Sequence, residues 1–315
     1  MVRRVGPLPS MNESDLHTHI YARSGNLIAG GSNEIIVGPG DDCAVIRSGS
    51  GELSLLTVDQ LVERRHFTSD TDLNLIARKA IARSVSDIAA MGGGPSWALA
   101  TGVLPKDYQH ADALFDTLSK WAQHWHCPLI GGDIAVHASP DHPLTLTVTV
   151  GGSMPTGTSP VLRSGAEPGD LLCVTGPLGD SFRSNHHLTF EPRIEAGRWA
   201  AINNAHAMMD ISDGLGRDSN RMAKASNVRI EIHASKLAMN PGCKNWKQAV
   251  SEGEDYELLI ALDSKTFADE TSTQLSQLLD PIGTVRACEP NEKPGARIVD
   301  SDGTLHDASQ LGWEH

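Results

Sequence analysis

The sequence is poor in cysteine, and its cysteines form no recognisable motif. They are odd in number and scattered, and no two have a CxxC spacing: Cys43, Cys127, Cys173, Cys243 and Cys288. Disulfide frameworks usually show even, closely spaced sets, and structural zinc sites usually contain CxxC pairs. The sequence therefore predicts neither feature, and we interpret the cysteines as small core residues in a reducing compartment.

Long apolar runs and an excess of positive charge are also missing. No stretch approaches the roughly 18 apolar residues of a membrane-spanning helix, and no apolar segment follows the two arginines near the N-terminus, as it would in a secretory signal. The formal net charge is −13, so the field of the protein repels nucleic acid and anionic lipid. We predict a cytoplasmic protein that has neither a membrane nor nucleic acid as a partner.

The length and composition of the chain are typical of a globular protein with two domains. Hydrophobic residues make up 39% of the 315 residues and charged residues 21%, and this length accommodates two cores of about 150 residues each. The tract "SMPTGTSPVLRSGAEPGD" is long and dense in Gly, Pro, Ser and Thr, without hydrophobic periodicity. We place the boundary at its start and predict domains of 1–153 and 154–315.

Both halves of the chain mix helix and strand patterns. In the first half, alternating and β-branched residues predict strands at 53–59 and 144–150, and apolar stripes predict helices at 72–93 and 111–125, the first with Asp72 as its N-cap. The second half predicts strands at 170–176, 207–212, 228–233 and 256–262, and helices near 193–204 and 214–226. We therefore expect an α+β fold with mixed α/β character in both halves.

Aspartates recur where the predicted elements end, often beside glycine. Asp41 and Asp42 follow the turn "GPG", Asp59 ends "LLTVD", Asp87 lies near the end of the first helix, Asp133 follows a strand in "PLIGGD", and Asp210 and Asp213 lie in "MMDISDGLG". Binding sites are often built where rigid elements pass into loops. Clusters of carboxylate oxygens suit hard cations such as Mg²⁺.

Each aspartate also has a purely structural interpretation. GD and DG pairs are common turn sequences, and Asp87 has Arg83 at the i−4 position, which allows an ion pair on one helix face. The number of sites nevertheless favours function, because glycines beside three of them let the backbone approach a bulky polyanion. Carboxylates can hold phosphates only through metal ions, and the sequence lacks the GxxxxGK[ST] motif. We predict a polyphosphate held by magnesium.

The order of the acidic blocks carries a resemblance to a known family. The blocks "GPGDDCAVI", "SVSDIAAMGG", "LIGGD", "MMDISDGLG" and "GEDYELLI" resemble, in order and over nearly the whole chain, those of the thiamine-monophosphate kinase family: GDDAAV, NLSDLAAMGA, GGDT, DISDGL and GEDYEL. The resemblance implies ATP-dependent and Mg²⁺-dependent phosphorylation of thiamine monophosphate to thiamine diphosphate by in-line transfer. It also implies a two-domain fold like that of aminoimidazole-ribotide synthetase, with an N-terminal domain that binds ATP and Mg²⁺ and forms a homodimer, and a C-terminal α/β domain.

The resemblance also implies roles for individual residues. The magnesium ligands of the family correspond to Asp42, Thr57, Asp59, Asp87, Asp133, Asp210 and Asp213. Its ATP contacts correspond to Gly132, Asp133, Arg163 and Ser212, and its contacts with thiamine monophosphate to His66, Glu254 and Trp313. The catalytic set is then Asp59, Asp87, Asp133 and Arg163. The acceptor is a phosphate oxygen that is already ionised, so catalysis needs positioning and charge neutralisation rather than a general base.

The chain departs from the family pattern at five positions near these motifs. Where the family has Thr, Thr, Gly, Asn and Thr, this chain has Val58, Gln60, Arg64, Ser84 and Ile134. The lost hydroxyls at Val58 and Ile134 remove candidate ligands, and Arg64 is expected to alter the grip on the substrate phosphate, which affects the rate more than the reaction class.

Two alternatives to the kinase stay open. One is a sister ATP-dependent activity of the same superfamily, although its hydrogenase-maturation members use a C-terminal cysteine and this chain ends "LGWEH". The other is a nucleotide-binding regulatory protein with a degenerate site.

Overall fold

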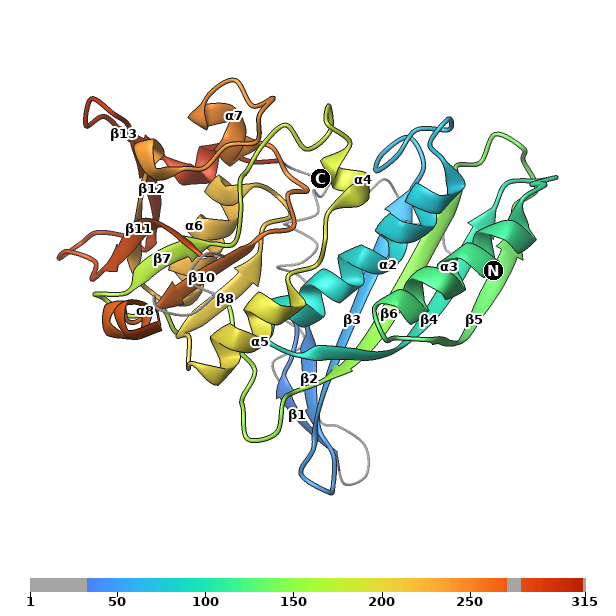
Figure 1. The fold of residues 1–315 in the computed structure, drawn as a ribbon, viewed down its shortest axis with the longest axis horizontal. Coiled ribbons are helices and arrows are strands. Elements are labelled where there is room, and N and C mark those ends of the chain that lie inside the picture. The colour runs from blue at the N-terminus through green and yellow to red at the C-terminus, as the bar shows by residue number, and fades with distance from the viewer. Residues whose placement is uncertain (1–32, 271–278, 314–315) are drawn as a thin grey trace, which may run out of the picture.

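The strands of the chain form two separate sheets, seen side by side in Figure 1. The structure, a computed structural model, describes residues 33–270 and 279–313. The first sheet has six strands in the order β1-β2-β3-β6-β4-β5, and the second has seven in the order β13-β12-β9-β11-β7-β10-β8. Helices accompany both sheets, which confirms the predicted fold class. The boundary predicted at 153/154 stays a prediction.

The first sheet is covered by helices on one face. Its strands are β1 (Glu34–Val37), β2 (Ala44–Arg47), β3 (Leu53–Val62), β4 (Gly94–Leu104), β5 (Leu129–Val136) and β6 (Thr145–Ser153). Only β4 and β5 pair in parallel within it. The covering helices are α2 (Leu73–Ala90) and α3 (Ala111–His124), which lie against the same side of the sheet (Figure 1).

Strand alternation decides which side chains of the first sheet meet α2. On β6, Leu146, Val148 and Val150 are buried in the core with α2, as their alternation with threonine predicts. On β3 the apolar Val58 points the other way and is 62% exposed. The odd-numbered residues of β3 therefore face the helix, and this places Thr57 and Asp59 on the α2 side.

Helix α2 lies between the first sheet and the second half of the chain. Its predicted N-cap is confirmed, because the Asp72 side chain accepts a hydrogen bond from the Asn74 N–H. Its last residue is Ala90, and it is followed by the C-cap Met91 and by Gly92, which has a φ of 80°. On its other side, a Cβ at Gly197 would lie 2.0 Å from the Ala89 carbonyl oxygen, so only glycine permits this close approach of the next domain.

The second sheet carries helices on both faces. Its strands are β7 (Leu171–Val174), β8 (Ala207–Asp210), β9 (Arg229–His233), β10 (Leu258–Leu262), β11 (Asp280–Arg286), β12 (Gly295–Val299) and β13 (Leu305–Asp307). Its helices are α4 (His186–Thr189), α5 (Ile194–Ile202), α6 (Leu215–Ala225), α7 (Trp246–Ser251) and α8 (Ser264–Glu270). Residues of α5 share one core with β8 and β10, and residues of α6 share another with the opposite face of the sheet.

Most of the expected elements are present within a few residues of their expected ends. Sequence patterns did not reveal β1, β2, β4, β11, β12 and β13, and they indicated only the start of β5, the strand expected directly before Asp133. The β4 sequence "GPSWALATGVL" is dominated by small residues, which give little alternation even though the strand is central. All five cysteines are free thiols, three of them buried and two partly exposed. Among the described residues, no helix is both long and apolar enough to cross a membrane.

Candidate active site

Three carboxylates from distant parts of the sequence meet where the two halves of the chain join. Asp42 lies in the turn before β2, Asp87 near the end of α2, and Asp210 at the last position of β8. Each offers one oxygen, and these three oxygens all lie within 4.8 Å of one another. Asp42 and Asp210 are buried. We call these three residues the carboxylate cluster.

The adjacent residues Asp41 and Asp42 have different surroundings. The Asp41 carboxylate accepts hydrogen bonds from the backbone N–H of Asp42 at 3.0 Å and of Arg163 at 3.1 Å. Burial, reinforced by the charge of Asp42, raises the pKa of Asp41 to about 6. Asp42 Oδ1 binds the Arg163 guanidinium, with Nε at 3.2 Å, whereas its buried Oδ2 has no hydrogen-bond partner. Asp41 therefore stabilises the turn through hydrogen bonds to the backbone, and Asp42 has one oxygen available to bind a cation.

Thr57 and Asp59 of β3 extend the carboxylate cluster along α2. The Thr57 hydroxyl donates to Asp87 Oδ2, and Asp59 accepts a hydrogen bond from Ser84 at 3.3 Å. Arg83 lies 3.5 Å from Asp59 and donates to the Gln60 carbonyl at 2.7 Å. The partner of Arg83 is thus Asp59, and the purely structural interpretation of Asp87 as an i,i+4 partner of Arg83 was wrong.

The electrostatics of the carboxylate cluster favour a bound cation. Burial, followed by the charge of Asp59, raises the pKa of Asp87 well above its ordinary value, and burial followed by the charge of Asp42 does the same for Asp210. Buried like charges are stable only when they are protonated or neutralised by a cation. The three convergent carboxylates and the unpartnered Asp42 Oδ2 are a donor set that fits Mg²⁺.

The residues after β8 form a tight polar turn next to the carboxylate cluster. The Asp218 carboxylate accepts hydrogen bonds from the backbone N–H groups of Ser212 at 3.1 Å and Asp213 at 3.0 Å. Asp213 itself forms an ion pair with Arg221 at 2.6 Å. This turn is the "DISDGL" block, and it brings Ser212 to the edge of a second feature.

That second feature is a small pocket that we call the acceptor pocket. Its lining residues are Arg65, His66, Phe182, Ser212, Gly253, Glu254 and Trp313. The three residues predicted to contact the acceptor, His66, Glu254 and Trp313, are therefore gathered in one place by segments from both halves of the chain. The backbone N–H of Trp313 donates to the Asp213 carbonyl at 2.8 Å.

Three lining residues of the acceptor pocket were missed at the sequence level: Arg65, Phe182 and Gly253. Gly253 opens the "GEDYELLI" block, so its position was a usable signal. Arg65 is directly before the expected contact His66, so its position was a usable signal. Phe182 belongs to no motif, so the sequence contained no signal for it. Its ring centroid lies 6.4 Å from that of Trp313.

Gly132 and Asp133 are not brought to the carboxylate cluster. They lie inside β5, and Asp133 pairs in register with Thr101, whose exposed side chain is on the face turned away from α2. The expectations that Asp133 follows a strand and that Asp59 ends one were wrong, because both lie within strands. The GD pair in this block had a turn as its purely structural interpretation, but Gly132 lies in a strand and allows close strand packing, since a Cβ there would lie 1.9 Å from the Ala100 carbonyl oxygen.

Two of the departures from the family pattern lie outside the carboxylate cluster. Val58 points to the open face of the first sheet, and Ile134 lies in β5, where both side chains are more than half exposed. Neither position therefore withholds a hydroxyl from the cluster. At Ser84, by contrast, the side chain is buried and donates to Asp59.

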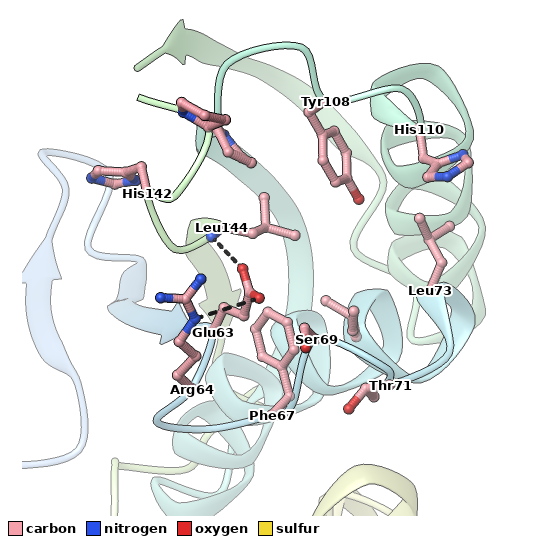
Figure 2. Close-up of a pocket in the computed structure, with 13 residues that line it drawn as sticks. Glu63, Arg64, Phe67, Ser69, Thr71, Leu73, Tyr108, His110, His142 and Leu144 are labelled. Atoms are coloured by element: carbon pink, nitrogen blue, oxygen red, sulfur yellow. Dashed lines mark hydrogen bonds and ion pairs between the residues drawn. The ribbon is translucent and has the colours of Figure 1, made fainter. Parts of the chain in front are cut away.

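Arg64 is directed to a different pocket from the acceptor pocket. Its φ of 66° is in the left-handed region that favours glycine, and it lines a cavity of about 300 Å³ together with Glu63, Phe67, Tyr108 and His142 (Figure 2). Arg64 Nε lies 3.9 Å from Glu63 Oε1. The arginine that lines the acceptor pocket is Arg65, and the expected effect of Arg64 on the substrate phosphate stays a prediction.

The chain matches two family models that together cover most of the described residues. Residues 40–154 match the N-terminal domain of AIR synthase related proteins, and residues 163–275 match their C-terminal domain. The chain thus belongs to the AIR synthase related class.

Curated relatives define the family more closely. The thiamine-monophosphate kinase of Bacillus subtilis is 31% identical over 90% of this chain and 94% of its own length, and that of Rhodopirellula baltica is 34% identical over 80% and 84%. A solved structure described as "AaThiL complexed with AMPPCP and TMP" superposes with a TM-score of 0.81 at 27% identity, covering 99% of both chains. The chain belongs to the thiamine-monophosphate kinase family.

The raised pKa values of Asp87 and Asp210 generate a prediction about pH and metal. Their folded-state pKa values lie above the ordinary value of 3.8, so without metal the folded protein binds more protons than the unfolded chain above about pH 4. The stability of the metal-free protein should therefore fall as the pH rises toward neutrality. Mg²⁺ competes with these protons, so its stabilising effect should grow with pH.

Thermal unfolding midpoints in EDTA and in Mg²⁺, at pH 6 and pH 8, measure both effects. Asp210→Asn should raise the midpoint in EDTA and weaken the response to Mg²⁺, whereas the exposed Asp112→Asn should change neither. A wild-type midpoint that is indifferent to Mg²⁺ at both pH values would contradict a metal-binding role for the cluster.

Proposed function

We propose that this chain catalyses the ATP-dependent phosphorylation of thiamine monophosphate to thiamine diphosphate. The observation that carries the proposal is the placement of the acceptor pocket beside the carboxylate cluster, with Ser212 and Asp213 linking the two. The relatives named thiamine-monophosphate kinase support it, as does the neighbouring structure whose description includes AMPPCP and TMP.

Magnesium is held, in this proposal, by the carboxylate cluster of Asp42, Asp87 and Asp210. Thr57, Asp59 and Asp213 lie in or beside the same region and complete the proposed ligand set. The ion would neutralise the phosphate charges of ATP and orient the transferred group. Gly132 and Asp133 lie on β5, apart from this set. Their expected nucleotide and metal roles stay predictions.

The side chains of this protein then divide the remaining work. Arg163, bound to Asp42 and only 23% exposed at its side chain, supplies a fixed positive charge next to the cluster for the nucleotide phosphates. In the acceptor pocket, Arg65 and His66 suit the phosphate of thiamine monophosphate, and Trp313 suits its aromatic and cationic rings. No general base is required, because the attacking phosphate oxygen is already ionised.

The proposal is tested by incubating the purified protein with ATP, Mg²⁺ and thiamine monophosphate. We expect thiamine diphosphate to form, and we expect Asp87→Asn to abolish turnover without unfolding the protein. The same result for Asp133→Asn would support the role that the resemblance implies for it, although it lies apart from the carboxylate cluster. Asp112→Asn, on the exposed start of α3, is the matched control. ATP binding without turnover would favour the regulatory alternative, and phosphorylation of another acceptor only would favour a sister activity.

Trp313 generates a prediction that separates the two substrates. Stacking or cation–π contact with the thiamine rings is worth roughly 0.5 to 2 kcal/mol, so Trp313→Ala should raise the KM for thiamine monophosphate about two- to thirtyfold. The KM for ATP should stay nearly constant. Steady-state kinetics with each substrate varied in turn decides it. Equal changes for both substrates, or none for the acceptor, would return Trp313 to a structural role.

We also propose that the protein is a cytoplasmic homodimer assembled through the first sheet. The support for dimerisation is the edge strand β5, which is exposed along most of its length and carries Ile130, Ile134 and Val136 at 64%, 52% and 66% exposure. Large exposed apolar groups on an edge strand usually require a cover. Free thiols are consistent with a reducing compartment.

Light scattering at micromolar concentration measures the assembly. We expect the mass of two chains, and Ile134→Lys should shift it toward one chain by placing a charge in the proposed interface. Met239→Lys, another exposed apolar position but in the second half of the chain, is the control. A fully active wild-type monomer would contradict the dimer.

A further inference from the structure

A lysine inside the protein joins the two walls of the acceptor pocket. Lys79, on α2, has a side chain that is 0% exposed. Its ammonium Nζ donates to Glu254 Oε2 at 2.6 Å and to the His66 carbonyl oxygen at 2.8 Å. One wall belongs to the loop after β3 and the other to the segment before β10, so Lys79 touches both without itself lining the pocket.

Glu254 is held in an unusual conformation by its neighbours. Its φ is 63°, which costs free energy for any residue that has a Cβ. Its N–H donates to the Ser212 carbonyl at 2.7 Å, and its carbonyl accepts from the Ser181 hydroxyl at 2.6 Å. The backbone is thus fixed from two sides, and Lys79 fixes the carboxylate.

The His66 side of the acceptor pocket is organised in a similar way. His66 Nδ1 accepts a hydrogen bond from the Val62 N–H at 2.9 Å, which orients the ring, and Lys79 binds the His66 carbonyl. The two walls come from different halves of the chain, so the distance between them depends on the side chains that contact both. Lys79 makes that connection with two hydrogen bonds from one charged group.

Stability alone does not explain a lysine at this position. A buried ion pair gains little net stability, because the cost of removing both charges from water offsets their attraction. Burial lowers the pKa of Lys79 to about 8 even though Glu254 raises it, which reflects that cost. An apolar side chain of similar length would fill the same space, so the charge must contribute something other than packing.

We propose that Lys79 is a positioning residue of the acceptor pocket, which sets the Glu254 carboxylate and the His66 loop at the separation that thiamine monophosphate requires. This inference rests on the proposed function, and it assigns Lys79 no contact with the substrate. In this proposal, the binding of ATP does not depend on Lys79.

The test is the kinetic comparison of Lys79→Met with wild type. Methionine keeps the length of the side chain and removes the charge. The KM for thiamine monophosphate should rise at least roughly tenfold, as expected for the loss of a charge-assisted hydrogen bond that orders the site. The KM for ATP should stay within about twofold.

Arg78→Met is the matched control, because Arg78 is the preceding residue of α2 and is similarly buried. Its guanidinium binds Glu191 at 2.8 Å and the Leu188 carbonyl at 3.3 Å, away from the acceptor pocket. The Arg78→Met variant should have a lower unfolding midpoint than wild type and unchanged KM values for both substrates. Equal rises in both KM values for Lys79→Met, no rise, or the same rise in Arg78→Met would overturn the proposal.

The double variant Lys79→Met/Glu254→Gln separates positioning from folding. Lys79→Met alone leaves a buried carboxylate without its cation and should lower the unfolding midpoint, whereas the double variant removes both charges and should recover part of it. The KM for thiamine monophosphate should stay raised in the double variant. If neither variant folds, Lys79 maintains the fold rather than the pocket, and the proposal fails. A wild-type protein that does not phosphorylate thiamine monophosphate would instead refute the proposed function itself.

Discussion

The burial of several carboxylates at one junction is the constraint on which the rest of the structure depends. Asp42, Asp87 and Asp210 come from three segments and lie within 4.8 Å of one another, largely out of water. Such an arrangement opposes folding unless protons or a cation neutralise it. The surrounding polar groups, the Thr57 hydroxyl and the Arg163 guanidinium among them, reduce that cost only in part.

Helix α2 is the element that makes this burial possible. It packs against the first sheet on one side and against α5 on the other, where Gly197 allows backbone contact at Ala89. Almost its whole length is buried, so each of its polar side chains needs a partner. Lys79 reaches Glu254, Ser86 donates to Asp210 at 2.8 Å, and Asp87 joins the carboxylate cluster. The helix therefore connects the acceptor pocket with the cluster inside the core.

Local sequence patterns predicted the elements that have clear periodicity or capping residues, and the family blocks predicted which residues would gather. The helix that begins at Asp72 and the strand at 144–150 are examples of the first kind, and His66, Glu254 and Trp313 of the second. Patterns failed for β4 and for the extent of β5, where small residues hide the alternation. They also failed to place Asp133, because the direction of its side chain depends on the register of β5 against β4, and register follows from pairing between distant segments.

Lys79 shows a further limit of sequence analysis. In the sequence it lies in "ARKAIAR", a stretch that resembles an ordinary charged helix surface, and only the position of α2 between two domains turns it inward. A lysine is rarely buried without an oppositely charged partner. The partner of Lys79 is Glu254, which is distant in the sequence. No local pattern contains this information.

Two of the charged doublets in the chain illustrate how backbone geometry gives neighbouring charges different roles. Asp41 and Asp42 are adjacent, yet one accepts hydrogen bonds from the backbone and the other offers an oxygen to the carboxylate cluster. Arg64 and Arg65 are adjacent, yet the left-handed φ of Arg64 places it on a separate cavity while Arg65 lines the acceptor pocket. In both doublets the like charges do not share a site. Arg65 therefore places a positive charge at the acceptor pocket, and Asp42 places a negative one at the carboxylate cluster. A polyphosphate held by metal and an anionic acceptor need these opposite charges in separate places, and the backbone provides both within a protein of strongly negative net charge.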